Sequence, residues 1–296
     1  MLWFDRERQL LARLAALGGP IAVVMAVAAA TYACRYARWR WLLLRDGHRF
    51  GWWRGFGAYL GGFAFTATPG KVGELVRIRG FGVLGVPAPR TIAVFVFERA
   101  LDLIVVLALS LLVASRFPAF ALVAAVVLAM VAAVVVAACW APLQRPVSAL
   151  IAWLPGARLR ALATTLFDGL RASAPLWRPR PLAVGLGWGV AAWTLTAAAF
   201  AWLCAAAGLA LPPAIAFGIY PLAMLAGAVS FVPGGVGTTE AAIVLLLTGA
   251  GVATADALAV AIGARLATLW FAVAVGLVAT ACNEWLAARE ARTRPP

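Results

Sequence analysis

Charged residues are scarce in this sequence, and acidic residues are scarcer still. Charged side chains make up 12% of the 296 residues, and 11 Asp and Glu face 25 Lys and Arg. A soluble domain carries roughly 25% charged residues, so this composition excludes an ordinary soluble globular protein. Hydrophobic residues make up 65% of the chain, and several apolar segments reach the ~20 residues that a membrane-spanning helix needs. We therefore expect an all-α polytopic integral membrane protein.

Histidine and cysteine are also rare, which removes several kinds of site. The single histidine, His48, lies in a basic segment, so a catalytic or metal-binding histidine cluster is excluded. The four cysteines, Cys34, Cys139, Cys204 and Cys282, are spread over four apolar segments. They have neither the spacing of metal ligands nor the pattern of a disulfide framework. We expect no catalytic residue, no metal, no cofactor and no enzymatic activity.

The basic residues that give the net charge of +14 lie beside apolar segments. This placement indicates membrane topology and contact with anionic headgroups rather than binding to nucleic acid. The first basic segment carries Arg35, Arg38, Arg40, Arg45, Arg49 and Arg54 against Asp46 alone, and residues 141–180 carry six arginines against Asp168 alone. The positive-inside rule makes both segments, and the basic carboxyl tail, cytoplasmic in an inner membrane. Four tryptophans in or near the first segment are interpreted as an interfacial aromatic belt: Trp39, Trp41, Trp52 and Trp53.

The apolar segments predict one transmembrane domain over residues 1–296. Five full spans are expected at 20–36, 91–115, 119–140, 181–207 and 255–285, with the amino end outside. An amphipathic helix is expected at 1–18, and a helix on the headgroups at 159–170. The domain divides into a first repeat at 20–140, the cytoplasmic segment at 141–180 and a second repeat at 181–288.

Two proline-glycine breaks interrupt apolar segments. The first is Thr-Pro-Gly-Lys-Val-Gly-Glu at 68–74, and the second is Val-Pro-Gly-Gly-Val-Gly at 232–237, with Glu240 just after it. Each break separates two apolar pieces, most of which are too short to span a membrane comfortably, so we expect two re-entrant hairpins. Broken helices that carry charge are costly in a bilayer unless they line a protected, wet cavity.

The two breaks share an order of break, acid and arginine, with Arg99 and Arg265 each in the span that follows its break. Three predicted spans separate the breaks, and an odd number reverses the direction of the second unit. This is the inverted-repeat plan of transporters, with a substrate site between the breaks near the membrane midplane. The alternative is a chance similarity in a chain rich in alanine and glycine.

Charged residues inside apolar segments are the strongest indication of a site. Glu98 and Asp102 share a helix face, and Arg99 reaches Asp102 at a spacing of three. Local ion pairs that only fix helix packing would explain these three residues equally well. Four other charged residues lack an evident local partner: Lys71, Arg79, Glu240 and Arg265. Of these, Glu240 and Arg265 are spaced so that they could pair across segments.

A broken helix also suggests what the site binds. Half-helices that begin near Gly70 and Gly234 expose free backbone N–H groups and a positive dipole end, which bind phosphate or carboxylate. The candidate substrate-binding residues are Pro69, Gly70, Lys71, Gly73, Glu74, Arg77, Glu98, Arg99, Asp102, Pro233, Gly234, Gly235, Gly237, Thr238, Glu240 and Arg265. The four acids among them are either counter-ions or proton carriers, and the sequence does not separate these roles.

At these residues the chain resembles the flippase-like family, which comprises the transmembrane region of lysylphosphatidylglycerol synthases and its stand-alone relatives. The matching features are the two breaks, the Glu98-Arg99-x-x-Asp102 pattern and Arg265. The resemblance implies two re-entrant hairpins and movement of lipids, or lipid-linked molecules, between leaflets, with the motif residues along the headgroup path. The synthases add a soluble aminoacyl transferase domain; only a short tail follows Trp285 here, so we expect no aminoacyl transfer.

Three functions remain open at this point. The first is a translocator of an anionic phospholipid or a polyprenyl-linked lipid, which predicts a cleft open sideways to the bilayer. The second is a transporter of a small anionic solute, which predicts a closed, water-facing cavity. The third is a membrane enzyme acting on a lipid phosphate, with Asp102 or Glu240 as a base.

Overall fold

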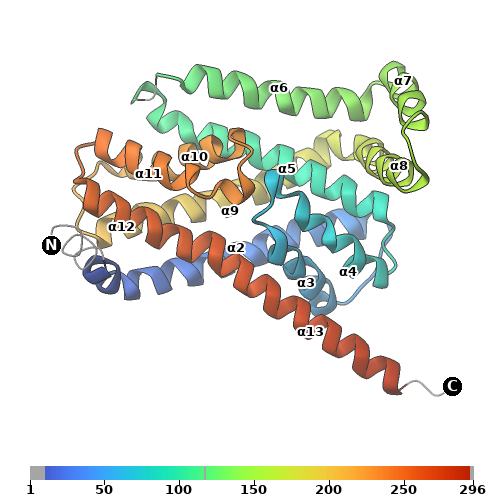
Figure 1. Cartoon of the computed structure of the whole chain (residues 1–296), viewed down its shortest axis with the longest axis horizontal. Helices are drawn as coiled ribbons and strands as arrows, with labels where there is room; N and C mark the ends of the chain where they lie inside the picture. Colours follow the sequence, from blue (N-terminus) through green and yellow to red (C-terminus); the bar gives the residue numbers. More distant parts are fainter. Residues whose placement is uncertain (1–10, 117, 294–296) are drawn as a thin grey trace.

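The computed structural model describes residues 11–116 and 118–293, and every regular element in these two ranges is a helix (Figure 1). This confirms the predicted all-α polytopic membrane fold. Of the predicted amino-terminal helix at 1–18, residues 11–16 are helical, and residues 1–10 lie outside the described ranges.

Four described helices are long and apolar enough to cross a membrane: α2 (Gly18–Arg45), α6 (Phe120–Cys139), α9 (Pro179–Ala206) and a continuous helix at Thr254–Arg289. The last of these runs through α12 (Thr254–Arg265) and a π-helical turn (Leu266–Trp270) into α13 (Phe271–Thr293). A further helix, α5 (Ala88–Ser110), has 23 residues but carries Glu98, Arg99 and Asp102 in its middle. It corresponds to the span predicted at 91–115, the second of the five.

Helix α2 runs nine residues beyond the end predicted for the first span, from residue 36 to Arg45. No glycine or proline interrupts residues 21–46. The helix ends where Gly47 adopts a positive φ of 90°, and His48 N–H donates to the carbonyl of Leu43, as at many helix C-termini. The first arginines of the basic segment therefore lie on a membrane helix and not in a loop.

The first break folds the chain into a hairpin. Helix α3 (Trp52–Gly61) and the short 3-10 turn η1 (Gly62–Phe65) lead to the break, and η2 (Pro69–Val76) and α4 (Arg77–Val83) lead away from it. A Cβ placed on Gly80 would lie 3.0 Å from the Cβ of Ala58, and one on Gly73 would lie 2.6 Å from the carbonyl of Phe65. These pairings show that the two arms run antiparallel.

The second break forms a similar hairpin from α10 (Pro213–Val229), η5 (Pro233–Gly235) and α11 (Thr238–Gly249). In Figure 1 the α3–α4 hairpin occupies one half of the molecule and the α10–α11 hairpin the other half. Their tips meet near the centre: a Cβ on Gly234 would lie 3.0 Å from the Cα of Ala67. Two segments far apart in the sequence thus form one junction.

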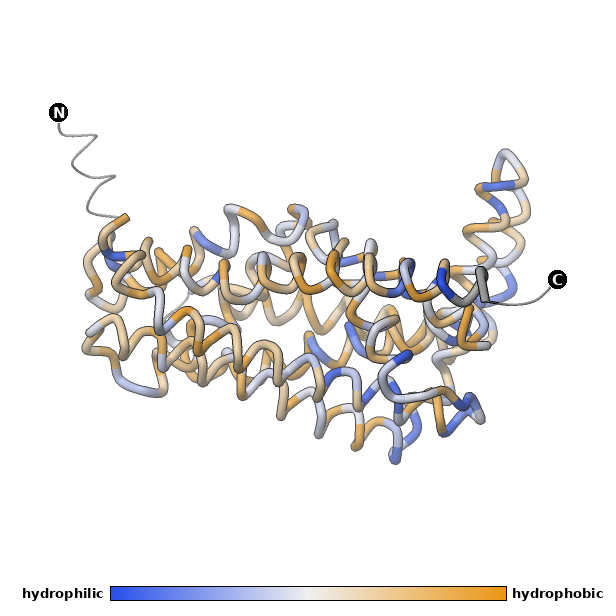
Figure 2. Tube along the Cα trace, turned by 90° about the horizontal axis from the view of Figure 1, so that it is seen from below, coloured by the Kyte–Doolittle hydropathy of each residue, from blue (hydrophilic) through white to orange (hydrophobic). Residues whose placement is uncertain are grey.

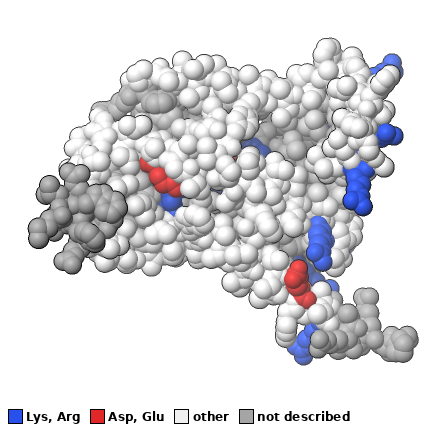
Figure 3. All heavy atoms as spheres, in the orientation of Figure 1, with Lys and Arg blue, Asp and Glu red and all other residues white. Residues whose placement is uncertain are grey.

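Basic residues gather at one end of the molecule, as Figure 3 shows. This end holds α7 (Ala141–Ala152), α8 (Ala157–Ala172) and the carboxyl-terminal part of α13. Figure 2 shows hydrophilic residues concentrated toward the same end and apolar residues along much of the remaining length. The helix expected at 159–170 is present as α8, which packs against α5. Helix α7 lies in a stretch for which we predicted no helix.

The buried apolar residues form two clusters on either side of the charged part of α5. One contains Val105, Phe200 and Leu225, together with other residues of α9, α10 and α12. The other is rich in aromatic side chains and includes Tyr36 and Phe81. Large apolar residues of α6 are exposed, as expected for a surface that faces lipid.

Candidate functional site

Two arginines of α2 face the acids of α5. An Arg38 terminal nitrogen lies 2.5 Å from Oε1 of Glu98 and 2.9 Å from Oδ1 of Asp102. Arg35, one turn earlier, lies 2.8 Å from Oδ2 of Asp102. Arg38 and Glu98 are completely buried, and burial of such groups requires a charged partner. The assignment of Arg35 and Arg38 to a cytoplasmic loop is therefore wrong, because α2 continues and carries both side chains into the protein.

Trp39 is also misplaced by the sequence interpretation. Its indole N–H donates to Oε2 of Glu98 at 2.7 Å, and its ring is fully buried against Phe81. It is therefore a core residue of the charged network and not part of an interfacial belt. Trp53, by contrast, is 79% exposed, as expected for a belt residue.

The arms of the first hairpin are tied by Glu74 and Arg77. Their side chains lie 2.8 Å apart, Thr66 donates to the other oxygen of Glu74 at 2.7 Å, and Arg77 Nε donates to the carbonyl of Tyr59 at 2.8 Å. The Arg77 guanidinium also lies 4.1 Å from the centre of the Tyr59 ring, a cation–π distance. These bonds hold the break in one shape.

Arg99 makes the local pairs expected from its spacing. A terminal nitrogen lies 3.0 Å from Glu98 and 3.2 Å from Asp102. The two acids are shared with Arg35 and Arg38, so the local-pair interpretation holds but describes only part of a larger network. Arg99 is the most exposed of these three arginines, with 19% of its side chain accessible against 11% for Arg35 and 0% for Arg38.

The second break is held by Arg265. Its Nε lies 2.7 Å from Oε1 of Glu240, which confirms the predicted pair, and a terminal nitrogen donates to the carbonyl of Gly234 at 2.6 Å. Thr238 donates locally to the carbonyl of Gly235 at 3.2 Å. Arg265 thus connects α12, α11 and the tip of the hairpin.

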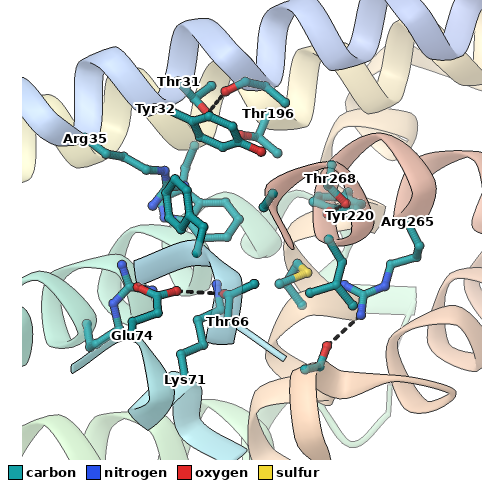
Figure 4. A pocket seen from close by; sticks show the side chains of 18 residues that line it. Thr31, Tyr32, Arg35, Thr66, Lys71, Glu74, Thr196, Tyr220, Arg265 and Thr268 are labelled. Atoms are coloured by element: carbon teal, nitrogen blue, oxygen red, sulfur yellow. Dashed lines mark hydrogen bonds between the residues drawn. The ribbon is translucent and has the colours of Figure 1, made fainter. Parts of the chain in front are cut away.

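A polar cavity of about 100 Å³ lies where the two hairpin tips meet (Figure 4). Four cations line it, one from each of α2, the first hairpin, α5 and α12: Arg35, Lys71, Arg99 and Arg265. Glu74 is the acid among its lining residues. Hydroxyl-bearing side chains complete the wall: Thr31, Tyr32, Thr66, Thr196, Tyr220 and Thr268. The cavity is therefore suited to an anion.

An apolar groove of about 470 Å³ adjoins this cavity, with α5, α6 and α10 as its walls. Its lining includes Val106, Val127, Val131 and Leu225. Five residues line both spaces: Lys71, Arg99, Trp193, Met224 and Gly234. A polar compartment and an apolar one therefore meet at Lys71 and Arg99.

The structure distributes the predicted site residues over three locations. The polar cavity receives Lys71, Glu74, Arg99, Gly234 and Arg265, and the apolar groove receives Gly70, Asp102 and Gly235, with Lys71, Arg99 and Gly234 lining both. The others shape the breaks or their ion pairs and line neither space: Pro69, Gly73, Arg77, Glu98, Pro233, Gly237, Thr238 and Glu240. Arg79 is exposed outside both spaces.

Sequence reasoning missed several residues of the cavity wall, including Tyr32, Arg35 and Trp193. A signal for those on α2 was present. Thr31, Arg35 and Arg38 lie at helical spacings of four and three in an otherwise apolar helix, which places polar side chains on one face. The positive-inside rule explains these arginines as loop residues, because it counts basic residues near a span and does not locate the end of the helix.

Lys71 lies at the tip of the first hairpin in the left-handed backbone region, with φ of 58°. Residues other than glycine are uncommon in this backbone region, and those that occur there cluster at functional sites. In the part of the chain that the structure describes, the Lys71 side chain has neither an ion pair nor a hydrogen bond. Its ammonium group thus remains available at the boundary of the two spaces.

The family described as the lysylphosphatidylglycerol synthase TM region matches residues 1–276. Neither a curated protein nor a solved structure gave a match.

Proposed function

The chain belongs to the family of the lysylphosphatidylglycerol synthase transmembrane region, and from this premise we propose that it moves an anionic lipid between membrane leaflets. The family is one of membrane domains associated with lipid handling. The observation that carries the proposal is the shared boundary of the polar cavity and the apolar groove at Lys71 and Arg99. A lipid likewise joins a polar headgroup directly to an apolar chain, so its two parts match the polar cavity and the apolar groove.

The cationic cavity supports the headgroup half of this proposal. Moving an anion from water into hydrocarbon has a large free-energy cost, and fixed cations at the centre of a membrane protein remove much of that cost. Arg35 and Arg99 are held by acids, so their positions do not depend on a ligand. The headgroup binds between the hairpin tips while the hydrocarbon chain follows the groove along α5, α6 and α10.

The hairpin arrangement supports a path through the protein. The two hairpins are re-entrant, one from each side of the membrane, and form an inverted repeat with the site at their junction. Basic residues at one end indicate that this end, with the carboxyl terminus, faces the cytoplasm of an inner membrane. A shift of either hairpin tip then opens the cavity toward one leaflet.

The test is leaflet exchange in vesicles that contain the purified protein and a chain-labelled anionic phospholipid. We expect faster exchange than in protein-free vesicles. Val134→Trp, which narrows the groove, should slow the exchange, whereas Val136→Trp on the same helix, where the side chain is 43% exposed, should not. Transport of a small anion without any lipid exchange would instead favour the solute transporter.

A further inference from the structure

Cations outnumber acids around the two breaks. The cavity and its ion-pair network hold six cations, Arg35, Arg38, Lys71, Arg77, Arg99 and Arg265. Four acids face them: Glu74, Glu98, Asp102 and Glu240. The excess of six over four is two positive charges. In a membrane interior such an excess is unfavourable unless a ligand supplies the opposite charge.

Two uncharged hydrogen-bond donors on the cavity wall are buried and lack acceptors, in addition to Nε of Arg99. Tyr32 is 8% exposed and Trp193 is 6% exposed, and both line the polar cavity. The Tyr32 hydroxyl and the Trp193 indole N–H have no hydrogen-bond partner among the residues that the structure describes. Buried polar groups are nearly always bonded, and an indole N–H can only donate. Both groups therefore point to a ligand with acceptor atoms.

The positions of these donors agree with a single ligand. Figure 4 shows Tyr32 and Arg35 on α2 across the cavity from Lys71 and Glu74. Trp193 lies beside Arg35, whose guanidinium is 4.7 Å from the indole ring centre. The Tyr32 hydroxyl, the Trp193 N–H and the Lys71 ammonium thus come from three elements that border the same small space.

We infer that the headgroup held in the polar cavity is a phosphate monoester of a lipid, with a hydrocarbon chain in the apolar groove. A monoester carries a charge of about −1.5 to −2 at neutral pH and three strong acceptor oxygens. These properties match the two excess charges and supply acceptors for the donors of Tyr32, Trp193 and Lys71. A phosphate diester carries one charge and two free oxygens, and a zwitterionic headgroup carries no net charge. The inference rests on the proposed function and narrows its substrate class.

The experiment compares three lipids with the same chains and label in vesicles that contain the protein: phosphatidic acid, phosphatidylglycerol and phosphatidylcholine. We expect phosphatidic acid to exchange at least about tenfold faster than phosphatidylglycerol, the factor that loss of one charge-assisted hydrogen bond produces. Equal or faster exchange of phosphatidylglycerol would overturn the monoester inference and leave lipid translocation standing.

Binding is measured separately, by the thermal stabilisation of the detergent-solubilised protein by short-chain phosphatidic acid or phosphatidylglycerol. Preferential stabilisation by phosphatidic acid with no exchange of any lipid would retain the monoester site and overturn translocation. If inorganic phosphate stabilises the protein as much as short-chain phosphatidic acid does, the groove contributes nothing to binding and the lipid part of the inference is wrong.

Variants test the three donors. Trp193→Phe, Tyr32→Phe and Lys71→Gln should each reduce the preference for phosphatidic acid over phosphatidylglycerol, and Lys71→Arg should retain it. Tyr36→Phe is the matched control, because the Tyr36 hydroxyl donates outside the cavity, to the carbonyl of Trp52. Arg79→Gln, at an exposed arginine outside both spaces, controls for the loss of one charge. An unchanged lipid preference in all three donor variants would contradict the inference.

Discussion

Arg38 is the side chain on which the two buried acids of α5 most depend. It is fully buried and pairs with both Glu98 and Asp102. Removing one partner of a buried ion pair leaves an uncompensated charge and costs about 3–5 kcal/mol. We expect Arg38→Ala to lower the thermal unfolding midpoint of the detergent-solubilised protein strongly. Arg49→Ala, at an exposed arginine of the same basic segment, should change it little, and equal effects would contradict the buried network.

Arg265 allows a test in which charge is retained and geometry is not. Its guanidinium bonds Glu240 through one nitrogen and the Gly234 carbonyl through another. A lysine ammonium is a single point and does not reproduce this fork. We expect Arg265→Lys to slow lipid exchange by about tenfold, equal to a barrier change of ~1.4 kcal/mol. Exchange at the rate of the unmodified protein would show that the bonds from Arg265 to Glu240 and to the Gly234 carbonyl have no part in transport.

Individual pairs could be predicted from the sequence only where both partners lie on neighbouring helical turns or, as for Glu240 and Arg265, follow the same break. Glu74 with Arg77, and Arg99 with Asp102, follow from helix spacing. The bond from Arg38 to Glu98 joins residues 60 apart in sequence, and no local pattern contains that information. It depends on how α2 packs against α5.

Glycine at one helix crossing sets how closely α13 approaches the first hairpin. A Cβ on Gly276 would collide with the backbone of Phe63 and Ala64. Forced overpacking of this kind costs about 1–3 kcal/mol, so Gly276→Ala should lower the unfolding midpoint and slow lipid exchange. Gly187→Ala on α9, where nothing lies within 4 Å of the added carbon, should leave both unchanged or raise stability slightly. Similar destabilisation by both changes would argue against this crossing.

At the scale of elements, proline and glycine made both breaks visible in the sequence, because proline and glycine clustered within a few residues strongly favour a helix end. The end of α2 could not be predicted in this way, because residues 21–46 contain neither proline nor glycine. Its polar residues resemble a loop in composition, yet nothing between residue 21 and Arg45 stops the helix. Residues such as Trp39 were misplaced with it, because aromatic and basic side chains are common both at interfaces and in buried charged networks.

The direction of the two hairpins is a property of the whole molecule and can be tested by labelling. In a variant without its four native cysteines, Val83→Cys places a thiol at the open end of the first hairpin, and Ala210→Cys places one before the second. In inner-membrane vesicles of one orientation, a membrane-impermeant reagent should label only one of these two positions. Labelling of both from the same side would contradict the inverted repeat.

In the proposed re-entrant arrangement, the abutting tips at Ala67 and Gly234 would reduce the barrier between the two sides to a thin septum instead of a full bilayer thickness. Most of the transmembrane voltage would then fall across that septum, and each elementary charge that crosses it would exchange ~2.3 kcal/mol per 100 mV with the field. A cell interior that is electrically negative would drive an anionic headgroup outward without any coupled ion. In vesicles with a clamped potassium diffusion potential, reversing the voltage should therefore reverse the favoured leaflet for phosphatidic acid and leave phosphatidylcholine unaffected.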